Sequence, residues 1–190
     1  MALWSGLGYY ARARNLQRAA QEVVAAHGGR FPQRIEDIAA LPGIGRSTAA
    51  AIAVFAFGAR AAILDGNVRR VLARAFGIEG FPGEKAVEAR LWTLAESLLP
   101  DRELVAYTQG LMDLGATLCL LRRPRCDDCP VAAQCVARRE GRIDELPTPR
   151  VKRAVPQRSV RVLVLRHRGR VLLQQRPPHG IWGGMFSLPE

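Results

Sequence analysis

Lysine is almost absent from this chain of 190 residues, where only Lys85 and Lys152 occur, and cysteine is absent outside one short segment. Uninterrupted apolar runs are also lacking, because none approaches the roughly twenty residues that a membrane-spanning helix needs. The opening residues, MALWSGLGYY, have neither the charged leader nor the long apolar core of a secretory signal. These absences predict a soluble, intracellular protein of the cytoplasm.

The charge of the chain is strongly positive. The formal net charge is +11 and the isoelectric point is near 10.8, and nearly all the cations are arginines. Codon composition explains arginine in place of lysine, but it explains the excess of positive over negative charge less well. Because the arginine fork suits phosphate oxygens, the composition favours a polyanionic partner such as nucleic acid.

All four cysteines fall within seventeen residues, as Cys119, Cys126, Cys129 and Cys135. Thiols at this density favour one metal site, in which the two-residue loop between Cys126 and Cys129 supplies a pair of ligands. The alternatives are two disulfides, which need an oxidising compartment, or four unrelated buried thiols. An iron–sulfur cluster is preferred to zinc, since zinc sites more often show two short Cys or His pairs.

Residues 10–139 have a helical pattern of apolar positions. One face of the first helix would hold Leu16, Ala19, Ala20, Val23 and Val24, and His27-Gly28-Gly29 would end it. Gly, Pro or Asp bounds each of the later helices. The expected ranges are Ile35 to Ala40, Arg46 to Phe57, Val68 to Phe76, Glu84 to Leu98 and Leu104 to Ala116. The fold class is therefore mainly α over this part of the chain.

The pattern changes after residue 139. Residues 140–158 are polar and contain Pro147, Pro149 and Pro156, which predicts an extended linker. Val160 to Leu165 and Val171 to Gln175 are strand-like, and the turn between them predicts a β-hairpin. Two strands and a glycine-rich loop bury little core, so we expect the second domain to be incomplete.

The segment Leu41-Pro-Gly-Ile-Gly-Arg-Ser-Thr-Ala49 lies between two predicted helices. Gly43 and Gly45 allow a sharp turn that Ile44 anchors, and the turn leaves backbone amides exposed at the start of the next helix. Such amides bind phosphate, and Arg46 adds positive charge. A plain connection between two helices is the alternative, but the flanking helices, apolar anchor and basic charge favour a phosphate-binding helix–hairpin–helix.

Asp65 ends the apolar run Ile63-Leu64 and precedes a predicted helix. The simplest interpretation is an N-cap whose carboxylate accepts hydrogen bonds from the first turn. A carboxylate at that position can also face a cleft and stabilise a cationic sugar intermediate. The two roles can coexist, and the local sequence does not choose between them.

The hairpin, the aspartate and the cysteine segment stand in the order and spacing of the helix–hairpin–helix DNA glycosylases that carry a 4Fe-4S cluster. Within that family the chain resembles the MutY-type adenine DNA glycosylases, through Trp4 to Arg14, Leu64 to Val68 and Met112 to Gly115. Gln175 to Met185 after the hairpin looks like the start of the small α+β Nudix-like domain of these enzymes. The resemblance implies a helical glycosylase domain (1–118, hairpin at about 35–57), a cluster loop (119–139), the linker (140–158) and a Nudix-like part (159–190).

The resemblance also implies an activity, the excision of adenine mispaired with 8-oxoguanine or guanine in double-stranded DNA, by a monomer associated with the nucleoid. Endonuclease III-like relatives, which act on oxidised pyrimidines, carry a Schiff-base lysine where this chain has Ser47. The serine argues against that activity. A non-catalytic DNA-binding module is the remaining alternative.

Site residues follow from the matched motifs. Asp65 would stabilise the oxocarbenium-like state, with Asn67 in support, and Tyr9 would wedge into the base stack. Tyr9 could equally be a core tyrosine on sequence grounds. The expected DNA contacts in the hairpin are Gly43, Gly45, Arg46 and Ser47, and those in the cysteine segment are Arg122, Arg123 and Arg125. Cys119, Cys126, Cys129 and Cys135 would hold the 4Fe-4S cluster.

One family feature has no match in this sequence. The glutamate that protonates adenine at N7 precedes the Trp-x-Gly-Leu-Gly-Tyr-Tyr motif in the family, and no glutamate here corresponds to it. Loss of a general acid commonly slows a reaction by about 10²–10⁴-fold. We therefore expect the polypeptide on its own to be inactive or nearly so. Arg69, where some relatives carry a lysine that traps the product sugar, should not trap it, because arginine stays protonated.

Overall fold

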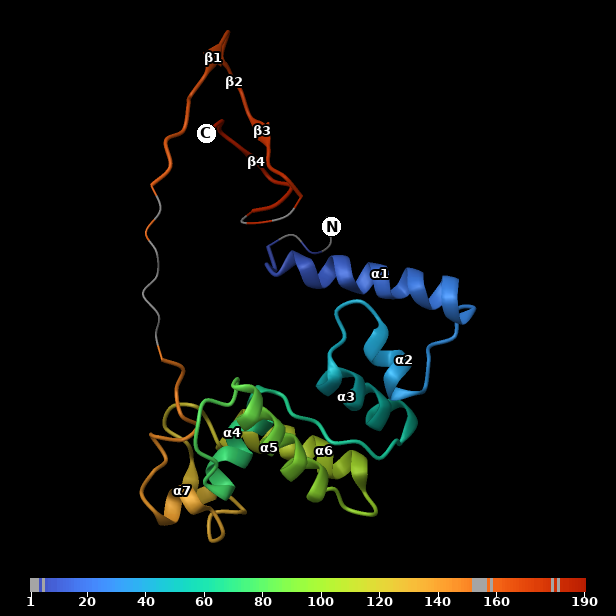
Figure 1. Cartoon of the computed structure of the whole chain (residues 1–190), viewed down its shortest axis with the longest axis vertical. Helices are drawn as coiled ribbons and strands as arrows, with labels where there is room; N and C mark the ends of the chain where they lie inside the picture. The colour runs from blue at the N-terminus through green and yellow to red at the C-terminus, as the bar shows by residue number, and fades with distance from the viewer. Residues whose placement is uncertain (1–3, 5, 152–156, 158, 179, 181) are drawn as a thin grey trace. The chain divides into compact units, whose positions relative to one another are not determined.

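The computed structural model describes residues 4, 6–151, 157, 159–178, 180 and 182–190, and it divides the chain into two compact units, Met1–Arg150 and Val151–Glu190 (Figure 1). The first unit is helical, and the second contains short strands. No helix in the described ranges is long and apolar enough to cross a membrane.

The helices of the first unit follow the predicted order. The longer ones are α1 (Tyr10–His27), α2 (Ile35–Ala40), α3 (Arg46–Phe57), α4 (Gly66–Phe76), α5 (Lys85–Ser97) and α6 (Leu104–Asp113). A π-helical turn, η2 (Leu114–Leu118), a 3₁₀ turn, η3 (Cys126–Asp128), and α7 (Val136–Arg139) complete it. Gly28, Gly58 and Gly77 end α1, α3 and α4 at positive φ, which glycine adopts without a Cβ penalty. All six predicted helices are confirmed, with ends that differ by three residues at most.

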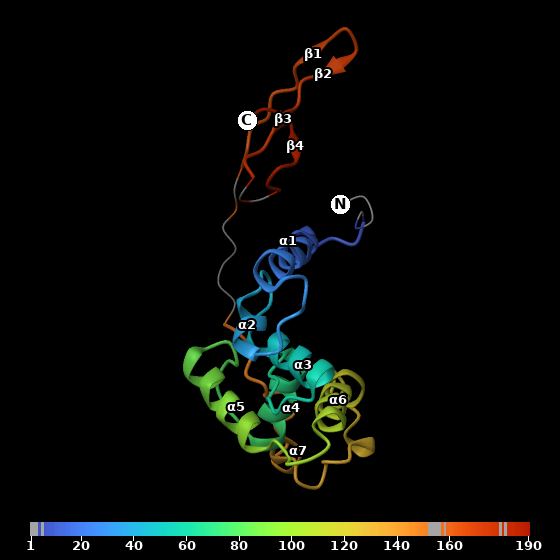
Figure 2. The same cartoon turned by 90° about the vertical axis from the view of Figure 1, so that its right-hand side faces the viewer.

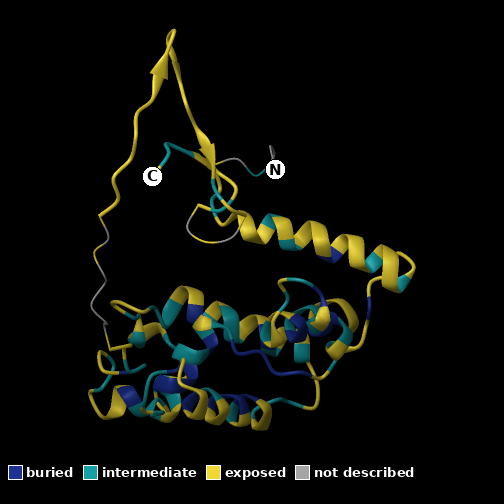
Figure 3. Cartoon of the chain, turned by 45° about the horizontal axis from the view of Figure 1, so that its top comes forward, coloured by how far each residue is buried: buried dark blue, intermediate teal, exposed yellow. Residues whose placement is uncertain are grey.

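The main core lies between α3, the extended segment 61–64, α4 and α5. In Figure 3 the extended segment is drawn as buried between exposed helical surfaces. Leu64, Leu72 and Leu91 are at most 2% exposed, and burial of each leucine contributes about 1.5–3 kcal/mol. Because α4 packs against α5, α6 and α7 (Figure 2), the residues at both of its ends are held in fixed positions.

Helix α1 buries less than its sequence predicts. Ala19 is the buried residue on this helix, whereas Leu16 is 64% and Val24 is 67% exposed. Asn15 and Val23 lie one turn to either side of Ala19 and are half-buried. The inward stripe therefore follows an i, i+4 spacing through Ala19 and is narrower than the predicted five-residue face.

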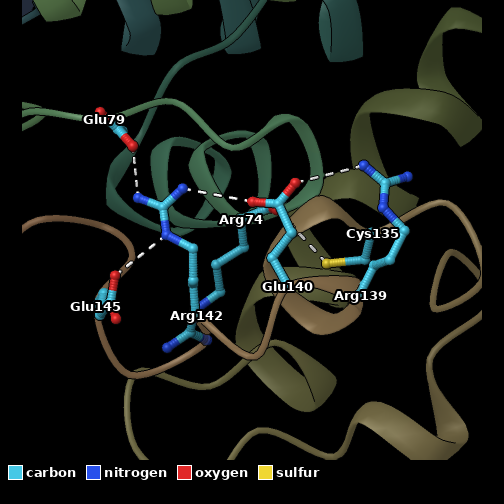
Figure 4. Close-up of polar contacts among 7 residues, drawn as sticks. All are labelled: Arg74, Glu79, Cys135, Arg139, Glu140, Arg142 and Glu145. Carbon is cyan, nitrogen blue, oxygen red and sulfur yellow. Dashed lines mark hydrogen bonds and ion pairs between the residues drawn. The ribbon is translucent and has the colours of Figure 1, made fainter.

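The first part of the expected linker packs against the helical unit. Leu146 is 2% exposed, and the Thr148 hydroxyl accepts a hydrogen bond from the Gly80 amide at 3.1 Å. Arg142 pairs with Glu79 at 2.6 Å and with the carboxylates of Glu140 and Glu145 (Figure 4). These carboxylates, Glu79 first, raise the pKa of Arg142 above its ordinary value. The predicted linker range thus begins with residues that pack on the helical unit, and residues 152–156 and 158 of that range lie outside the described residues.

The second unit contains the predicted hairpin with shorter strands. Strands β1 (Arg166–His167) and β2 (Arg170–Val171) pair antiparallel around Arg168-Gly169, and β3 (Gln174–Gln175) pairs with β4 (Phe186–Ser187). Arg168 and Gly169 both have positive φ, as a tight hairpin turn requires. Apolar side chains that include Val162, Leu165 and Leu172 are 49–54% exposed. Because few side chains pack against these apolar residues, the strands of the second unit stay short.

Candidate active site and cysteine cluster

The turn between α2 and α3 has the geometry of a phosphate-binding hairpin. Gly43 has a φ of +79°, and a Cβ there would lie 2.7 Å from Cβ of Asn15, so the position requires glycine. Gly45 is the N-cap of α3 and provides no side-chain cap, and space beside its Cα is open. The first amides of α3 therefore face outward at the positive end of the helix dipole, where an anion can approach.

Arg46, at the start of α3, is directed toward α5. Its guanidinium carbon lies 3.8 Å from the centroid of the Trp92 ring, and its Nη2 lies 2.6 Å from Oε1 of Glu96. The sequence predicted a phosphate contact for this arginine. The structure instead shows its charge engaged by an aromatic face and a carboxylate of the same unit.

Ser47 connects the hairpin to Asp65. The Ser47 hydroxyl accepts a hydrogen bond from the Leu64 amide at 2.9 Å. The next residue, Asp65, caps α4, because its Oδ1 accepts from the Val68 amide at 2.8 Å. Asp65 is half-buried, and within the described part of the chain its other oxygen, Oδ2, has no hydrogen-bond partner. The N-cap prediction is confirmed, and Oδ2 remains available to a ligand.

The first turn of α4 is fixed by contacts to other elements. Asn67 packs against Gly115, where an added Cβ would lie 2.6 Å from Cβ of Asn67. Its Oδ1 accepts from Arg70 at 2.8 Å, and Arg70 also donates to the carbonyls of Gly115 and Cys119. Arg69 donates to the Leu64 carbonyl at 3.2 Å and also pairs with Glu88. Asn67 and the two arginines thus hold the backbone on both sides of Asp65.

Tyr9 lies at the N-terminus of α1 with its side chain 81% exposed. This exposure excludes the core-tyrosine interpretation. Its φ of +46° is uncommon for a residue other than glycine, asparagine or aspartate. The structure shows an accessible aromatic ring there and does not place it against Asp65.

The four cysteines line one cavity together with apolar side chains such as Val71, Leu118 and Ile143. Cys119 follows η2, Cys126 begins η3, Cys129 follows η3, and Cys135 caps α7. Burial, then the charges of Cys119 and Cys135, raises the pKa of the Cys126 thiol, which Arg138 opposes. As placed, the described residues contain no group of three or more His, Cys, Asp or Glu side chains that could hold a metal ion. The donor set nevertheless suits iron or zinc bound by thiolates.

Three arginines line the same cavity, namely Arg74, Arg125 and Arg138. Arg74 donates to the carbonyl oxygens of Leu120 and Leu146 and is 3% exposed. Figure 4 shows the Cys135 thiol next to Arg74, and Cys135 Sγ lies 3.5 Å from the Arg74 carbonyl oxygen. Sequence analysis missed this residue. The available signal was a charged side chain beside Val71, Leu72 and Ala73 in an otherwise apolar stretch of a helix.

The arginines predicted to meet DNA near the cysteines differ in their surroundings. Arg125 pairs with Asp128 at 2.7 Å. Arg122 and Arg123 are exposed, and neither forms an ion pair or hydrogen bond with the part of the chain that the structure describes. Their charges are therefore the more available ones on this loop.

With this geometry in place, comparison with known proteins identifies the family. Residues 1–97, about half of the chain, match the family described as "HhH-GPD superfamily base excision DNA repair protein". The chain belongs to this superfamily. The mainly helical glycosylase fold predicted from the sequence is thereby confirmed, and endonuclease III-type members of this superfamily generally carry a 4Fe-4S cluster.

Relatives named adenine DNA glycosylase extend beyond the matched region. The protein of that name from Buchnera aphidicola subsp. Acyrthosiphon pisum is 38% identical over 188 residues, which are 99% of this chain and 54% of the relative. The Homo sapiens protein of that name is 44% identical over 145 residues, covering 76% of this chain and 27% of the relative. The chain thus spans about half the length of the bacterial relatives that it matches.

Solved glycosylase structures share the HhH-GPD fold. A thermostable thymine-DNA glycosylase aligns with a TM-score of 0.59 at 36% identity, covering 68% of this chain and 59% of that one. A non-covalent endonuclease III–DNA complex aligns with a TM-score of 0.59 at 26% identity, covering 72% of this chain and 61% of that one.

Proposed function

We propose that this chain is an adenine DNA glycosylase that acts in base excision repair on the chromosome, excising adenine from mispairs with 8-oxoguanine or guanine in duplex DNA. Its relatives named adenine DNA glycosylase support this substrate. Ser47 supports it against the endonuclease III-like alternative, because a hydroxyl that accepts the Leu64 amide supplies no amine for a Schiff base.

The observation that carries the proposal is the position of the Asp65 carboxylate. Its Oδ1 is fixed by the Val68 amide, and the residue before it is tied to Ser47 at the start of the hairpin helix. When the glycosidic bond breaks, adenine leaves with the bonding electrons and C1′ becomes positively charged. A carboxylate whose Oδ2 faces that carbon stabilises the charge without having to reorganise, and water then adds to C1′ with loss of a proton.

The DNA contacts proposed here lie on the hairpin and the cysteine loop. Amides at Gly43, Gly45 and the first turn of α3 bind one backbone phosphate, and Arg122 and Arg123 meet others. Tyr9 supplies an exposed ring that can replace stacking lost when the adenine is flipped out. Asn67 supports the site by holding the first turn of α4 against Gly115.

We also propose that Cys119, Cys126, Cys129 and Cys135 ligate a 4Fe-4S cluster. The four thiols line a single cavity, and a 4Fe-4S cluster is held by four cysteine thiolates. The cluster would cross-link the loop that carries Arg122 and Arg123, and it takes no part in bond breaking. We further propose that the β-hairpin and the glycine-rich loop of the second unit belong to a Nudix-like domain.

Binding to a charged transition-state analogue tests the role of Asp65 without requiring catalysis. Duplexes would carry, opposite 8-oxoguanine, either a pyrrolidine that is cationic at the C1′ position or a neutral tetrahydrofuran of similar shape. We expect the chain to prefer the cationic duplex and Asp65→Asn to lose about tenfold or more of that preference. Asp101→Asn, at an exposed aspartate, is the control. Equal discrimination by Asp65→Asn and the unaltered chain would rule out the proposed role.

The substrate class is tested with single-turnover assays on duplexes that carry adenine or an oxidised pyrimidine, with borohydride present in parallel. A covalent adduct would favour the endonuclease III-like alternative. DNA binding without preference for the cationic analogue would favour a non-catalytic module. The expected inactivity of the polypeptide on its own remains a prediction, and efficient adenine excision would show that one of its residues supplies the proton.

A further inference from the structure

Arg74 is a buried arginine whose donors are all directed at the cysteine region and the segment that follows it. The residue lies on α4 and is 3% exposed. Its Nε donates to the Leu146 carbonyl at 2.7 Å, and its Nη1 and Nη2 donate to the carbonyls of Leu120 and Leu121 at 2.6 and 3.1 Å. Its Nη1 also lies 3.5 Å from Sγ of Cys119. The guanidinium therefore meets neutral carbonyls and one sulfur.

The other two arginines of the cavity each pair with a carboxylate, whereas Arg74 pairs with none among the described residues. Arg125 pairs with Asp128 at 2.7 Å, and Arg138 pairs with Asp127 at 2.9 Å. These aspartates occupy the two positions between Cys126 and Cys129. Arg74 forms no ion pair with any carboxylate in the ranges that the structure describes. A fully buried positive charge is costly unless a negative charge lies nearby.

We propose that Arg74 is the buried counter-cation of a thiolate–metal centre formed by Cys119, Cys126, Cys129 and Cys135. A divalent ion or a 4Fe-4S cluster bound by four thiolates keeps a net negative charge. Arg74 is the cavity arginine whose own charge is not already balanced by an aspartate, so it offsets that charge and donates to the Cys119 sulfur. This inference rests on the metal centre proposed above.

The hydrogen bonds of Arg74 also connect helix α4 to the proposed metal centre. Arg74 lies nine residues after Asp65, roughly 13.5 Å along the axis of α4 at 1.5 Å per residue. Its hydrogen bonds to Leu120 and Leu121 fix the chain directly after the first cysteine ligand. Donors to a ligating sulfur both orient the ligand and tune the metal, and their loss commonly costs 10–100-fold in metal affinity, as an order of magnitude.

A purely structural role would have a different signature. If Arg74 served only to satisfy the carbonyls, then Arg74→Lys and Arg74→Met would both lower stability and would affect metal affinity alike. If its charge balances the thiolates, lysine should keep most of the metal affinity and methionine should not. The comparison of the two variants therefore separates charge from backbone bonding.

The test is a titration of the metal-free, reduced full chain with Co²⁺, followed by thiolate-to-cobalt charge-transfer absorbance, with thermal unfolding measured in parallel. We expect the unaltered chain to bind one Co²⁺, Arg74→Met to bind about tenfold more weakly, and Arg74→Lys to stay within about threefold. Arg139→Met is the control, because Arg139 is exposed, pairs with Glu140 and does not line the cavity, and its affinity should also stay within about threefold. If Arg74→Met does not fold, Arg74→Gln replaces it.

Each outcome bears on a different part of the argument. Equal Co²⁺ affinity of Arg74→Met and the unaltered chain would overturn the counter-cation role while leaving the metal centre intact. Equal losses in Arg74→Met and Arg74→Lys would overturn it in favour of backbone bonding alone. Failure of the unaltered chain both to bind Co²⁺ through thiolates and to show iron–sulfur absorbance when purified without oxygen would overturn both the centre and this inference. Because no DNA is present, none of these results depends on the glycosylase proposal.

Discussion

The guanidinium of Arg46 stacks on the ring of Trp92, with its central carbon 3.8 Å from the ring centroid. The same guanidinium pairs with Glu96, one turn further along α5. The first residue of the hairpin helix is thereby attached to a different helix of the unit. Arg46 thus links the start of α3 to α5.

We expect Arg46→Ala to weaken DNA binding without changing how steeply that binding depends on salt. An arginine that contacts a phosphate contributes about one to the slope of log K against log salt, and a positioning arginine contributes little. Loss of the stacking and the ion pair should lower the free energy of unfolding by about 0.5–1.5 kcal/mol. Arg60→Ala, an exposed arginine that donates to the Leu99 carbonyl, is the control. If the slope of log K against log salt fell by about one in Arg46→Ala, Arg46 would contact a phosphate, as the sequence predicted.

Ser47→Ala should destabilise the hairpin–Asp65 connection, because it removes the oxygen that accepts the Leu64 amide. A buried donor left without a partner costs about 1–3 kcal/mol, and Leu64 is 1% exposed. Chemical denaturation measures the loss. The neighbouring Thr48→Ala, at an exposed position on the same helix, should change stability by less than about 0.5 kcal/mol. Equal losses of stability in Ser47→Ala and Thr48→Ala would show that the hydrogen bond from the Leu64 amide to Ser47 does not stabilise the fold.

The two glycines of the hairpin should respond differently to alanine. Gly43→Ala introduces a Cβ 2.7 Å from Asn15 at a φ of +79°, so stability should fall by more than about 1 kcal/mol. Gly45→Ala meets open space at an ordinary φ and should fold normally. If a phosphate binds the adjacent amides, Gly45→Ala should still weaken DNA binding severalfold, as isothermal titration can measure. Unchanged affinity in Gly45→Ala would place the phosphate elsewhere.

The arginines of the cysteine loop should also divide into two groups. Arg122→Ala and Arg123→Ala should each reduce the salt slope of DNA binding by about one, since these side chains are exposed and free of partners within the described ranges. Arg125→Ala should reduce it less, because Asp128 already neutralises Arg125. Fluorescence anisotropy at several salt concentrations measures all three variants. The grouping fails if Arg125→Ala shows the largest change.

The identity of the metal has a direct optical test. Chain purified without oxygen should be brown, with broad visible absorbance and several iron atoms per chain, if the four thiols hold an iron–sulfur cluster. Removal of the cluster should also increase proteolysis between Cys119 and Cys135. A colourless, folded sample with one zinc per chain would replace the iron assignment with zinc.

Much of the helical unit could be predicted because its helix ends are marked locally. Glycine can follow a helix with positive φ and aspartate can cap its start, so Gly28, Gly77 and Asp65 set boundaries that the structure reproduces. The spacing of apolar residues predicted the buried face of α1 less accurately, because Leu16 and Val24 are exposed. Which face of a helix is buried depends on what packs against it, and local spacing does not encode that.

The sequence indicated which residues belong to the candidate site, but it did not indicate which of their side chains contact one another. Sequence motifs drew attention to Asp65, Ser47 and the cysteines, but not to the burial of Arg74 or to the stacking of Arg46 on Trp92. Those contacts join residues that are about 45 positions apart in the sequence. Long-range pairing of this kind is set by tertiary packing, on which propensity and spacing carry little information.

The π-helical turn Leu114–Leu118 leads directly into the first cysteine. The Cys119 amide bonds to the Leu114 carbonyl five residues earlier at 2.7 Å, so this turn holds one residue more than an α-helical turn would. In an α-helix each residue adds about 100° of rotation. Deleting one residue from this turn would therefore swing the Cys119 side chain about a quarter of the way around the helix axis. The extra residue thus sets the direction in which the helical unit presents its first thiol.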